Sequence, residues 1–206
     1  MNTLEASTIV GGLGKPSKMP GKAYGLPAKE CNVGSRLRDV PGSVCETCYA
    51  LKGRYVFDNV QTAQYRRLEA LNDPRWVSAM VTLVKDRVSW FRWHDSGDLR
   101  DATHFGMICA VAIACPDTQF WLPTKETGVI RRWLAAGQSI PSNLIVRVSG
   151  AMVDGAAPKG HAHTSTVHKS TEITGHECPA RHQAGKCGDC RACWDYDVPN
   201  IAYPWH

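Results

Sequence analysis

The chain has 206 residues, of which 43% are apolar and 21% charged, so it is long enough and apolar enough for a folded core rather than a disordered chain. Its net charge of +5 comes from scattered Lys and Arg, which does not indicate nucleic-acid binding. The sequence contains neither a membrane-length apolar segment nor a secretory signal at residues 1–16, so we expect a cytoplasmic protein.

The first part of the chain alternates strand-like and helix-like segments. Residues 1–20 are rich in Gly, Pro, Ser and Lys and predict an irregular arm, and residues 21–27 predict a short first strand. After a cysteine-rich loop, helices are expected from Asp58 and from Asp73-Pro74, an acid followed by Pro at the first helical position. Three later segments are predicted strands and two are predicted helices: strands over 88–93, 118–122 and 143–148, and helices over 101–114 and 127–136.

This alternation favours parallel strands joined by crossover helices, which is an α/β fold. A complete eight-stranded barrel needs about 250 residues. We therefore predict a partial, TIM-like β/α barrel over residues 21–152, which carries the N-terminal cysteine loop.

Residues 153–206 are predicted to form a His-containing loop followed by a cysteine-rich C-terminal extension. The loop to residue 177 carries few large apolar side chains, and His161-x-His163 is a weak metal signal without a third ligand nearby. The aromatic-rich end of the chain is expected to pack back on the body.

The nine cysteines fall into two groups and one pair. Because thiols stay reduced in a cytoplasm, close spacing there indicates metal binding rather than disulfides. Cys109 and Cys115 stand apart in an apolar helical segment and are expected to pack in the core.

The C-terminal group contains Cys178 and the run Cys187-x2-Cys190-x2-Cys193. Three thiols at this spacing plus one remote thiol are typical of ferredoxin-like ligation of an iron–sulfur cluster. Structural zinc is the alternative, although zinc sites more often use two separated C-x2-C pairs.

The N-terminal group contains Cys31, Cys45 and Cys48. Three thiolates on a 4Fe–4S cluster leave one iron open, which is what a catalytic metal needs. That iron could take substrate, water, S-adenosylmethionine or a further side chain. The alternatives are zinc with a fourth ligand such as His, and one structural site built from both cysteine groups.

Polar residues follow the predicted strands, at the edge that carries active sites in β/α folds. His94, Asp95 and Asp98 are the candidate catalytic residues: either carboxylate for a hydrogen bond to an amine or hydroxyl, and His94 for proton transfer. The alternative for Asp98 is a cap on the next helix.

Four further residues are candidates for cofactor binding. Gly97 would let a ligand approach the backbone, and Tyr49 would lie over a cluster or ligand unless it only packs. Lys125 either pairs with Glu126 or faces the ligand, and Ser149 follows the last predicted strand. Arg147 needs a partner if it points into the barrel.

Five segments resemble the gene product 88 family of phage proteins and occur in the family's order: LPAKEC (26–31), CETCYALKGRY (45–55), RWHDSGD (92–98), FWLPTKE (120–126) and CGDCRACW (187–194). The C-x-x-C-Y-A segment also resembles the cluster motif of radical S-adenosylmethionine enzymes. Their motif is C-x3-C-x2-C, whereas 13 residues separate Cys31 from Cys45 here.

These resemblances imply an iron–sulfur protein acting in the host cytoplasm. One hypothesis is a radical-S-adenosylmethionine-like enzyme with one or two 4Fe–4S clusters and an unknown small-molecule substrate. A second is a ferredoxin-like electron-transfer module that works with a redox partner, and a weaker third is a zinc-stabilised interaction protein.

Overall fold

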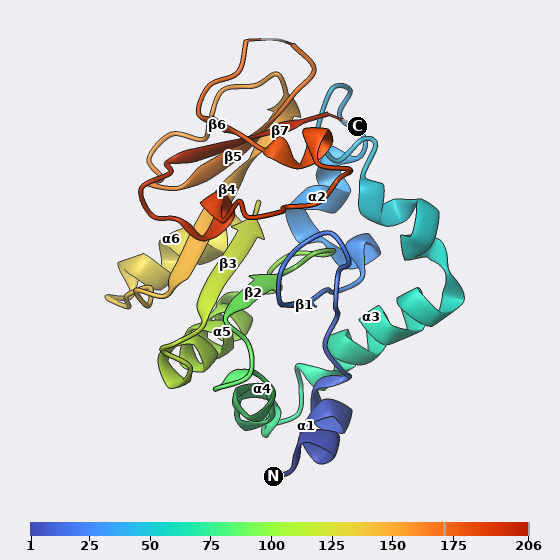
Figure 1. Cartoon of the computed structure of the whole chain (residues 1–206), viewed down its shortest axis with the longest axis vertical. Coiled ribbons are helices and arrows are strands. Elements are labelled where there is room, and N and C mark those ends of the chain that lie inside the picture. Colours follow the sequence, from blue (N-terminus) through green and yellow to red (C-terminus); the bar gives the residue numbers. More distant parts are fainter. Residues whose placement is uncertain (171, 206) are drawn as a thin grey trace.

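A parallel β-sheet runs through the protein (Figure 1). The computed structural model describes residues 1–170 and 172–205. The sheet order is β1-β2-β3-β4-β5-β7-β6, and every neighbouring pair is parallel. Its strands are β1 (Lys22–Tyr24), β2 (Trp90–Trp93), β3 (Gln119–Thr124), β4 (Leu144–Val153), β5 (Thr164–His168), β6 (His176–Glu177) and β7 (Asn200–Pro204). This sheet and its helices confirm the predicted α/β class.

Helices lie along one side of strands β1 to β4, and the segment that contains α2 lies near their carboxyl ends (Figure 1). The helices are α1 (Thr3–Val10), α2 (Asn32–Leu37), α3 (Asp58–Ala70), α4 (Trp76–Val84), α5 (Ala102–Ala114) and α6 (Thr127–Ala135). The part of the chain that is described includes no helix long and apolar enough to cross a membrane.

Several predicted elements lie where the sequence placed them. Helix α5 begins after Asp101, whose carboxylate accepts a hydrogen bond from the His104 backbone N–H at 2.8 Å. After α6, Gly137 takes the left-handed conformation expected of a residue that ends a helix. Cys109 and Cys115 are buried in the core, 3% and 1% exposed, which confirms their packing role.

The irregular arm predicted for residues 1–20 is wrong over residues 3–10, which form α1. The Asn2 side chain accepts from the Glu5 N–H at 2.9 Å and so caps the helix, and Gly11 ends it with φ 72°. Ile9 and Val10 then pack in the core. The Gly and Pro content that suggested an arm lies after the helix, not in it.

The loop predicted for residues 153–177 is also wrong in part, because it contains β5 and β6. Strand β5 buries hydroxyl groups instead of apolar side chains: Thr164 donates to Asn200 Oδ1 at 2.8 Å, and Asn200 donates to Thr166 at 3.0 Å. Since each polar atom has a partner, burial is tolerated, but the strand has no apolar pattern that a sequence could reveal.

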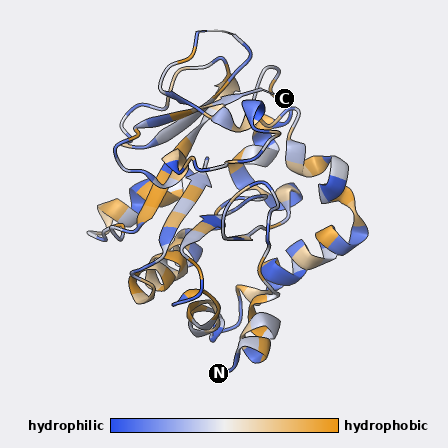
Figure 2. Ribbon diagram, viewed as in Figure 1, coloured by the Kyte–Doolittle hydropathy of each residue, from blue (hydrophilic) through white to orange (hydrophobic). Residues whose placement is uncertain are grey.

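Alternation along β2 and β3 gives the sheet two different faces. Phe91 and Phe120 belong to the core that packs on the helices, where Figure 2 shows hydrophobic stretches on the strands and helices. On the opposite face Arg92 pairs in register with Trp121, and Trp194 of the C-terminal extension packs edge-on against Trp121 at 5.2 Å between ring centroids. The cysteine-rich extension therefore covers the face opposite the helices.

Candidate metal centres at the strand ends

The N-terminal cysteine loop is tied to the carboxyl ends of β3 and β4. The Val44 N–H donates to the Ala151 carbonyl at 2.8 Å, and the Val153 N–H donates back to Gly42 at 2.9 Å. At the start of α2, the Val33 N–H donates to Glu126 Oε1 at 2.8 Å. These bonds hold the loop over the edge at which active sites of β/α folds lie.

Cys31, Cys45 and Cys48 are free, half-buried thiols that lie within electrostatic range of one another. Burial, then Asp98, then the other two thiols raise the pKa of Cys31 to about 12. Gly34 of α2 lies beside two of the sulfurs: a Cβ there would lie 3.6 Å from Cys31 Sγ and 3.7 Å from Cys45 Sγ. The structure thus brings the three predicted ligands together.

Asp98 joins the ends of β2 and β3. One carboxylate oxygen accepts from the Leu99 N–H at 2.8 Å and the Thr124 hydroxyl at 2.6 Å, and the other accepts from the Lys125 N–H at 2.8 Å. Burial raises the pKa of Asp98 to about 6 despite these bonds. Asp98 is not the cap of the next helix, because Asp101 fills that position.

Asp95 lies beside two tyrosines that follow the cysteine loop. The Tyr49 hydroxyl donates to the Asp95 carbonyl at 2.6 Å, and Tyr55 approaches the Asp95 carboxylate at 3.4 Å. Oδ1 of Asp95 is buried and has no hydrogen-bond partner among the described residues. Tyr49 also accepts from Arg92 Nη2 at 3.3 Å, so it does more than pack.

The His94 ring is buried in the core, 3% exposed, with its centroid 5.4 Å from that of His104 in α5. Burial, chiefly, lowers the pKa of His94 well below its ordinary value, so the ring is neutral. Its backbone is left-handed, with φ 55°. The structure therefore places this candidate proton-transfer residue against α5.

The remaining cofactor-binding candidates occupy three different settings. Gly97 has φ 75° and a Cβ there would lie 2.7 Å from Leu26, so the loop needs glycine to pass this segment. The positive charge of Lys125 opposes the burial that raises the pKa of Cys45. The Ser149 hydroxyl accepts a hydrogen bond from the Ser165 hydroxyl of β5 at 3.2 Å.

The C-terminal thiols gather around Cys178. Burial is the main cause that raises the pKa of Cys178, Cys187 and Cys193. The charge of Cys178 adds to the increase at Cys187 and Cys193, and the charge of Cys190 adds to the increase at Cys178. Cys193 Sγ lies 3.2 Å from the Tyr203 hydroxyl. The four predicted ligands are therefore neighbours, as the three N-terminal ones are.

Arg147 anchors the C-terminal extension to the sheet. Its side chain is fully buried, and its guanidinium donates to four backbone carbonyls at 2.7–3.0 Å, those of Ala192, Cys193, Asp195 and Val198. It points inward, and the partners that a buried charge requires are carbonyls of the cysteine-bearing segment.

No group of three or more His, Cys, Asp or Glu side chains in residues 1–170 and 172–205 is arranged to hold a metal ion. In a 4Fe–4S cluster each thiolate binds a different iron, so the thiols surround the cluster rather than meet at one point. The donor set of three neighbouring thiols fits such a cluster.

Sequence reasoning missed three contacts. Arg92 donates to Tyr49 beside the cysteine loop, Glu126 accepts from the start of α2, and the Tyr203 hydroxyl lies against Cys193. The alternation Phe91-Arg92-Trp93 was the available signal for Arg92, since it puts the charge on the face opposite two buried aromatics.

Fold and site together define an α/β protein with a parallel sheet and two groups of neighbouring thiols. Residues 2–196 match the gene product 88 family, so the chain belongs to that family. Comparisons with curated proteins and with solved structures gave no significant match.

Proposed function

We propose that the protein is an iron–sulfur redox protein in which Cys31, Cys45 and Cys48 hold a 4Fe–4S cluster with one open iron. The observation that carries the proposal is the gathering of these thiols, two of them beside Gly34, over the carboxyl ends of the strands. A bound cluster would supply one-electron transfer. The sequential order of β1 to β5 supports the finer proposal of a partial barrel.

Two carboxylates near these thiols already accept hydrogen bonds from the protein. Asp98 accepts three hydrogen bonds and Glu126 accepts from the start of α2. Because neither is free to approach the cluster without breaking these bonds, the fourth iron is left for an external ligand. This favours the enzyme, with S-adenosylmethionine as the candidate cosubstrate and Asp95, whose Oδ1 is unpartnered, as a candidate contact to it.

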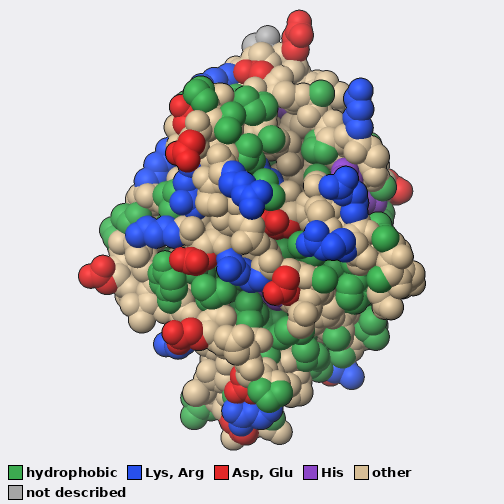
Figure 3. Space-filling model, turned by 180° about the vertical axis from the view of Figure 1, so that it is seen from behind, with side chains coloured by type: hydrophobic (Ala, Val, Ile, Leu, Met, Phe, Trp, Pro, Cys, Tyr) green, Lys and Arg blue, Asp and Glu red, His purple; other side chains and the backbone are tan. Residues whose placement is uncertain are grey.

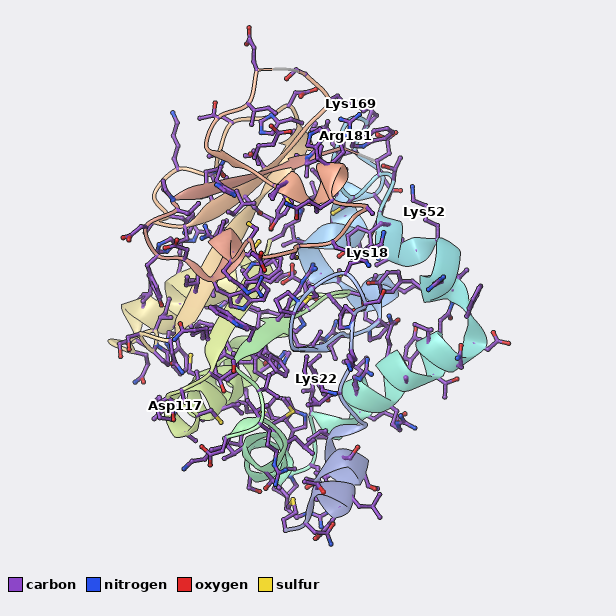
Figure 4. The ribbon with its side chains drawn as sticks, in the orientation of Figure 1. Lys18, Lys22, Lys52, Asp117, Lys169 and Arg181 are labelled. Carbon is purple, nitrogen blue, oxygen red and sulfur yellow. The ribbon has the colours of Figure 1, made fainter. Side chains whose placement is uncertain are left out.

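The second candidate is an electron-transfer module that uses both cysteine groups, with Cys178, Cys187, Cys190 and Cys193 holding a second cluster or zinc. It is favoured by the exposed cations beside the two groups. Figure 4 labels Lys52, which follows Cys48, and Arg181, which follows Cys178, in the same half of the molecule. Such a surface would suit an acidic redox partner.

The test is anaerobic purification followed by measurement of iron, sulfide and zinc per chain. About eight irons would indicate two 4Fe–4S clusters and about four would indicate one. A protein with zinc and no iron would contradict the proposal. Incubating reduced, iron-loaded protein with S-adenosylmethionine then separates the two candidates: 5′-deoxyadenosine is expected from the enzyme, and no binding or cleavage from the electron carrier.

A further inference from the structure

Arg92 of β2 extends from the sheet face that the C-terminal extension covers. Its guanidinium carbon lies 4.5 Å from the ring centroid of Trp121, its neighbour in register on β3. Stacking on an aromatic face favours a positive charge and fixes the plane of the guanidinium. The side chain is thus held in one place by a rigid pair of strands.

On one side Arg92 contacts the N-terminal cysteine loop. Its Nη2 donates to the hydroxyl of Tyr49, the residue after Cys48, at 3.3 Å. Tyr49 in turn donates to the Asp95 carbonyl at 2.6 Å, which keeps its ring over the strand end. Arg92 is therefore one side chain away from the first group of thiols.

On the other side Arg92 faces the C-terminal group. Its charge acts on Cys187 and Cys193, where it opposes the burial that raises the pKa of both thiols, and on Tyr203, whose hydroxyl is 3.2 Å from Cys193 Sγ. No carboxylate forms an ion pair with Arg92 within the described residues. The cation lies between the two thiol groups, and the carboxylate whose charge acts on it is that of Asp95, which is beyond ion-pair distance.

Two buried donors at this place lack a partner among the described residues: the Nε–H of Arg92 and the Nε1–H of Trp121. Trp121 is only 5% exposed, so its N–H lies in the interior of the protein. Leaving such donors unpaired destabilises a protein, because the desolvation of the N–H group is not offset by a hydrogen bond. A buried acceptor beside both residues would remove that cost, and cluster sulfur is an acceptor that responds to such bonds.

We propose that Arg92 and Trp121 form a shared electrostatic link between the two cysteine sites, raising the reduction potential of the clusters held at both. The inference rests on the proposed function. Each cluster gains one electron, and Arg92 keeps its proton throughout, so the fixed positive charge stabilises the more negative, reduced form. Hydrogen bonds and net charge near the sulfurs are known determinants of cluster potential.

The test is a redox titration with dithionite, followed by electron paramagnetic resonance, on the full chain loaded with iron and sulfide. Three variants separate charge from hydrogen bonding. Arg92→Gln removes the charge, Arg92→Lys keeps it, and Trp121→Phe keeps the ring and removes the N–H. Trp90→Phe is the control, because Trp90 packs on Trp194 as Trp121 does but has no unpartnered buried nitrogen.

We expect Arg92→Gln to shift both midpoint potentials downward and Arg92→Lys to leave both close to their wild-type values. Trp121→Phe should shift at least one midpoint potential downward, and Trp90→Phe should leave both unchanged. Wild-type potentials in Arg92→Gln at normal iron content would overturn the link, and so would a shift at one cluster only. If Arg92→Gln does not fold, Arg92→Lys and Trp121→Phe carry the test, and potentials unchanged in Trp121→Phe then count against it. Wild-type protein without iron refutes the proposed function itself, and iron analysis shows this before any titration.

Discussion

Gly34 shows how one missing side chain shapes a candidate site. A Cβ at this position would lie 3.0 Å from Cys31 Cβ and within 3.7 Å of two sulfurs. The two sulfur distances are ordinary van der Waals contacts, whereas the 3.0 Å contact requires Cys31 to shift by a few tenths of an ångström. Ala otherwise favours a helix by about 1 kcal/mol over Gly.

We predict that Gly34→Ala displaces Cys31 and so lowers the iron content of the N-terminal site, with a smaller change in the stability of the apo protein. Iron and sulfide per chain, with thermal unfolding of the apo protein, measure the two effects. Gly128→Ala in α6 is the matched control, since the nearest atom to its Cβ would be the mobile end of Arg132 at 3.4 Å. Full iron loading in Gly34→Ala would show that the thiols do not hold a cluster beside this residue.

Acid sensitivity is a second property of single residues. Burial lowers the pKa of His104 to about 4 and that of His94 well below its ordinary value. Below the ordinary histidine pKa of about 6.5, the unfolded chain therefore binds protons that the folded chain does not, and stability falls as pH falls. Asp98, with its pKa raised to about 6, binds a proton first in the folded chain and opposes this trend.

His94→Asn removes one of the two depressed histidines and suits the left-handed backbone, which Asn tolerates. Between about pH 6.5 and pH 5 we expect the variant to lose less stability than wild type, since the His94 ring that resists protonation in the folded chain is absent. Urea unfolding across this range measures the difference. His161→Asn should leave the slope unchanged, and parallel slopes for His94→Asn and wild type would refute the expectation.

At the scale of elements, the C-terminal extension depends on one arginine. Arg147→Met keeps much of the buried volume but leaves the four carbonyls between residues 192 and 198 without their donor. Unfolding stability should fall by about 3–5 kcal/mol, because several buried acceptors lose their partner. Denaturant unfolding and proteolysis near residues 175–200 measure this loss. Arg131→Met, at an exposed position of α6, should change little, and equal effects of the two variants would contradict the anchoring role.

Elements that bury apolar side chains could be predicted from the sequence, whereas an element that buries polar side chains could not. Strand β2 is predicted because its aromatic residues alternate around Arg92, and α5 because Asp101 caps an apolar run. Strand β5 could not be predicted, because its buried Thr and Ser depend on hydrogen-bond partners in β7, more than thirty residues away. Local periodicity contains no information about such partners.

The same distinction applies to the candidate site. The cysteine groups could be found from spacing alone, and the strand ends from their position after β-branched and aromatic runs. Arg92 could not be assigned a contact, since Tyr49 lies 43 positions away and Trp121 reaches it only through strand pairing. The sequence placed His94 beside the carboxylates, but the left-handed turn at that residue directs its ring to α5.

At the scale of the whole molecule, charge is dispersed with a local exception. The face in Figure 3 shows Lys and Arg interspersed with Asp and Glu. Lys18 is exposed and lies beside the loop before Cys187, and its carbonyl accepts a hydrogen bond from the Cys187 N–H at 2.8 Å. Lys52 follows the N-terminal cysteine group, and Arg181 follows Cys178 of the C-terminal group. These three cations thus lie near the two cysteine groups, where an electron donor would dock.

The triple variant Lys18→Glu, Lys52→Glu and Arg181→Glu should slow reduction of the iron-loaded protein by an acidic donor such as flavodoxin, and added salt should reduce the difference between variant and wild type. Stopped-flow absorbance measures both rates. Lys85→Glu, at an exposed site at the end of α4, is the control. Equal rates for the triple variant and wild type at low salt would exclude this surface as the docking site.

Strand β7 lies between β5 and β6 although it follows both in the chain. During synthesis, β6 and the cysteines around it must therefore wait for residues 200–204 to emerge before they gain a partner in the sheet, whereas the N-terminal loop can dock on β4 once residue 153 has emerged. Domains assemble from the N-terminus as they leave the ribosome. The N-terminal thiol group can thus reach its place on the sheet while β6, beside the C-terminal group, still lacks its partner strand.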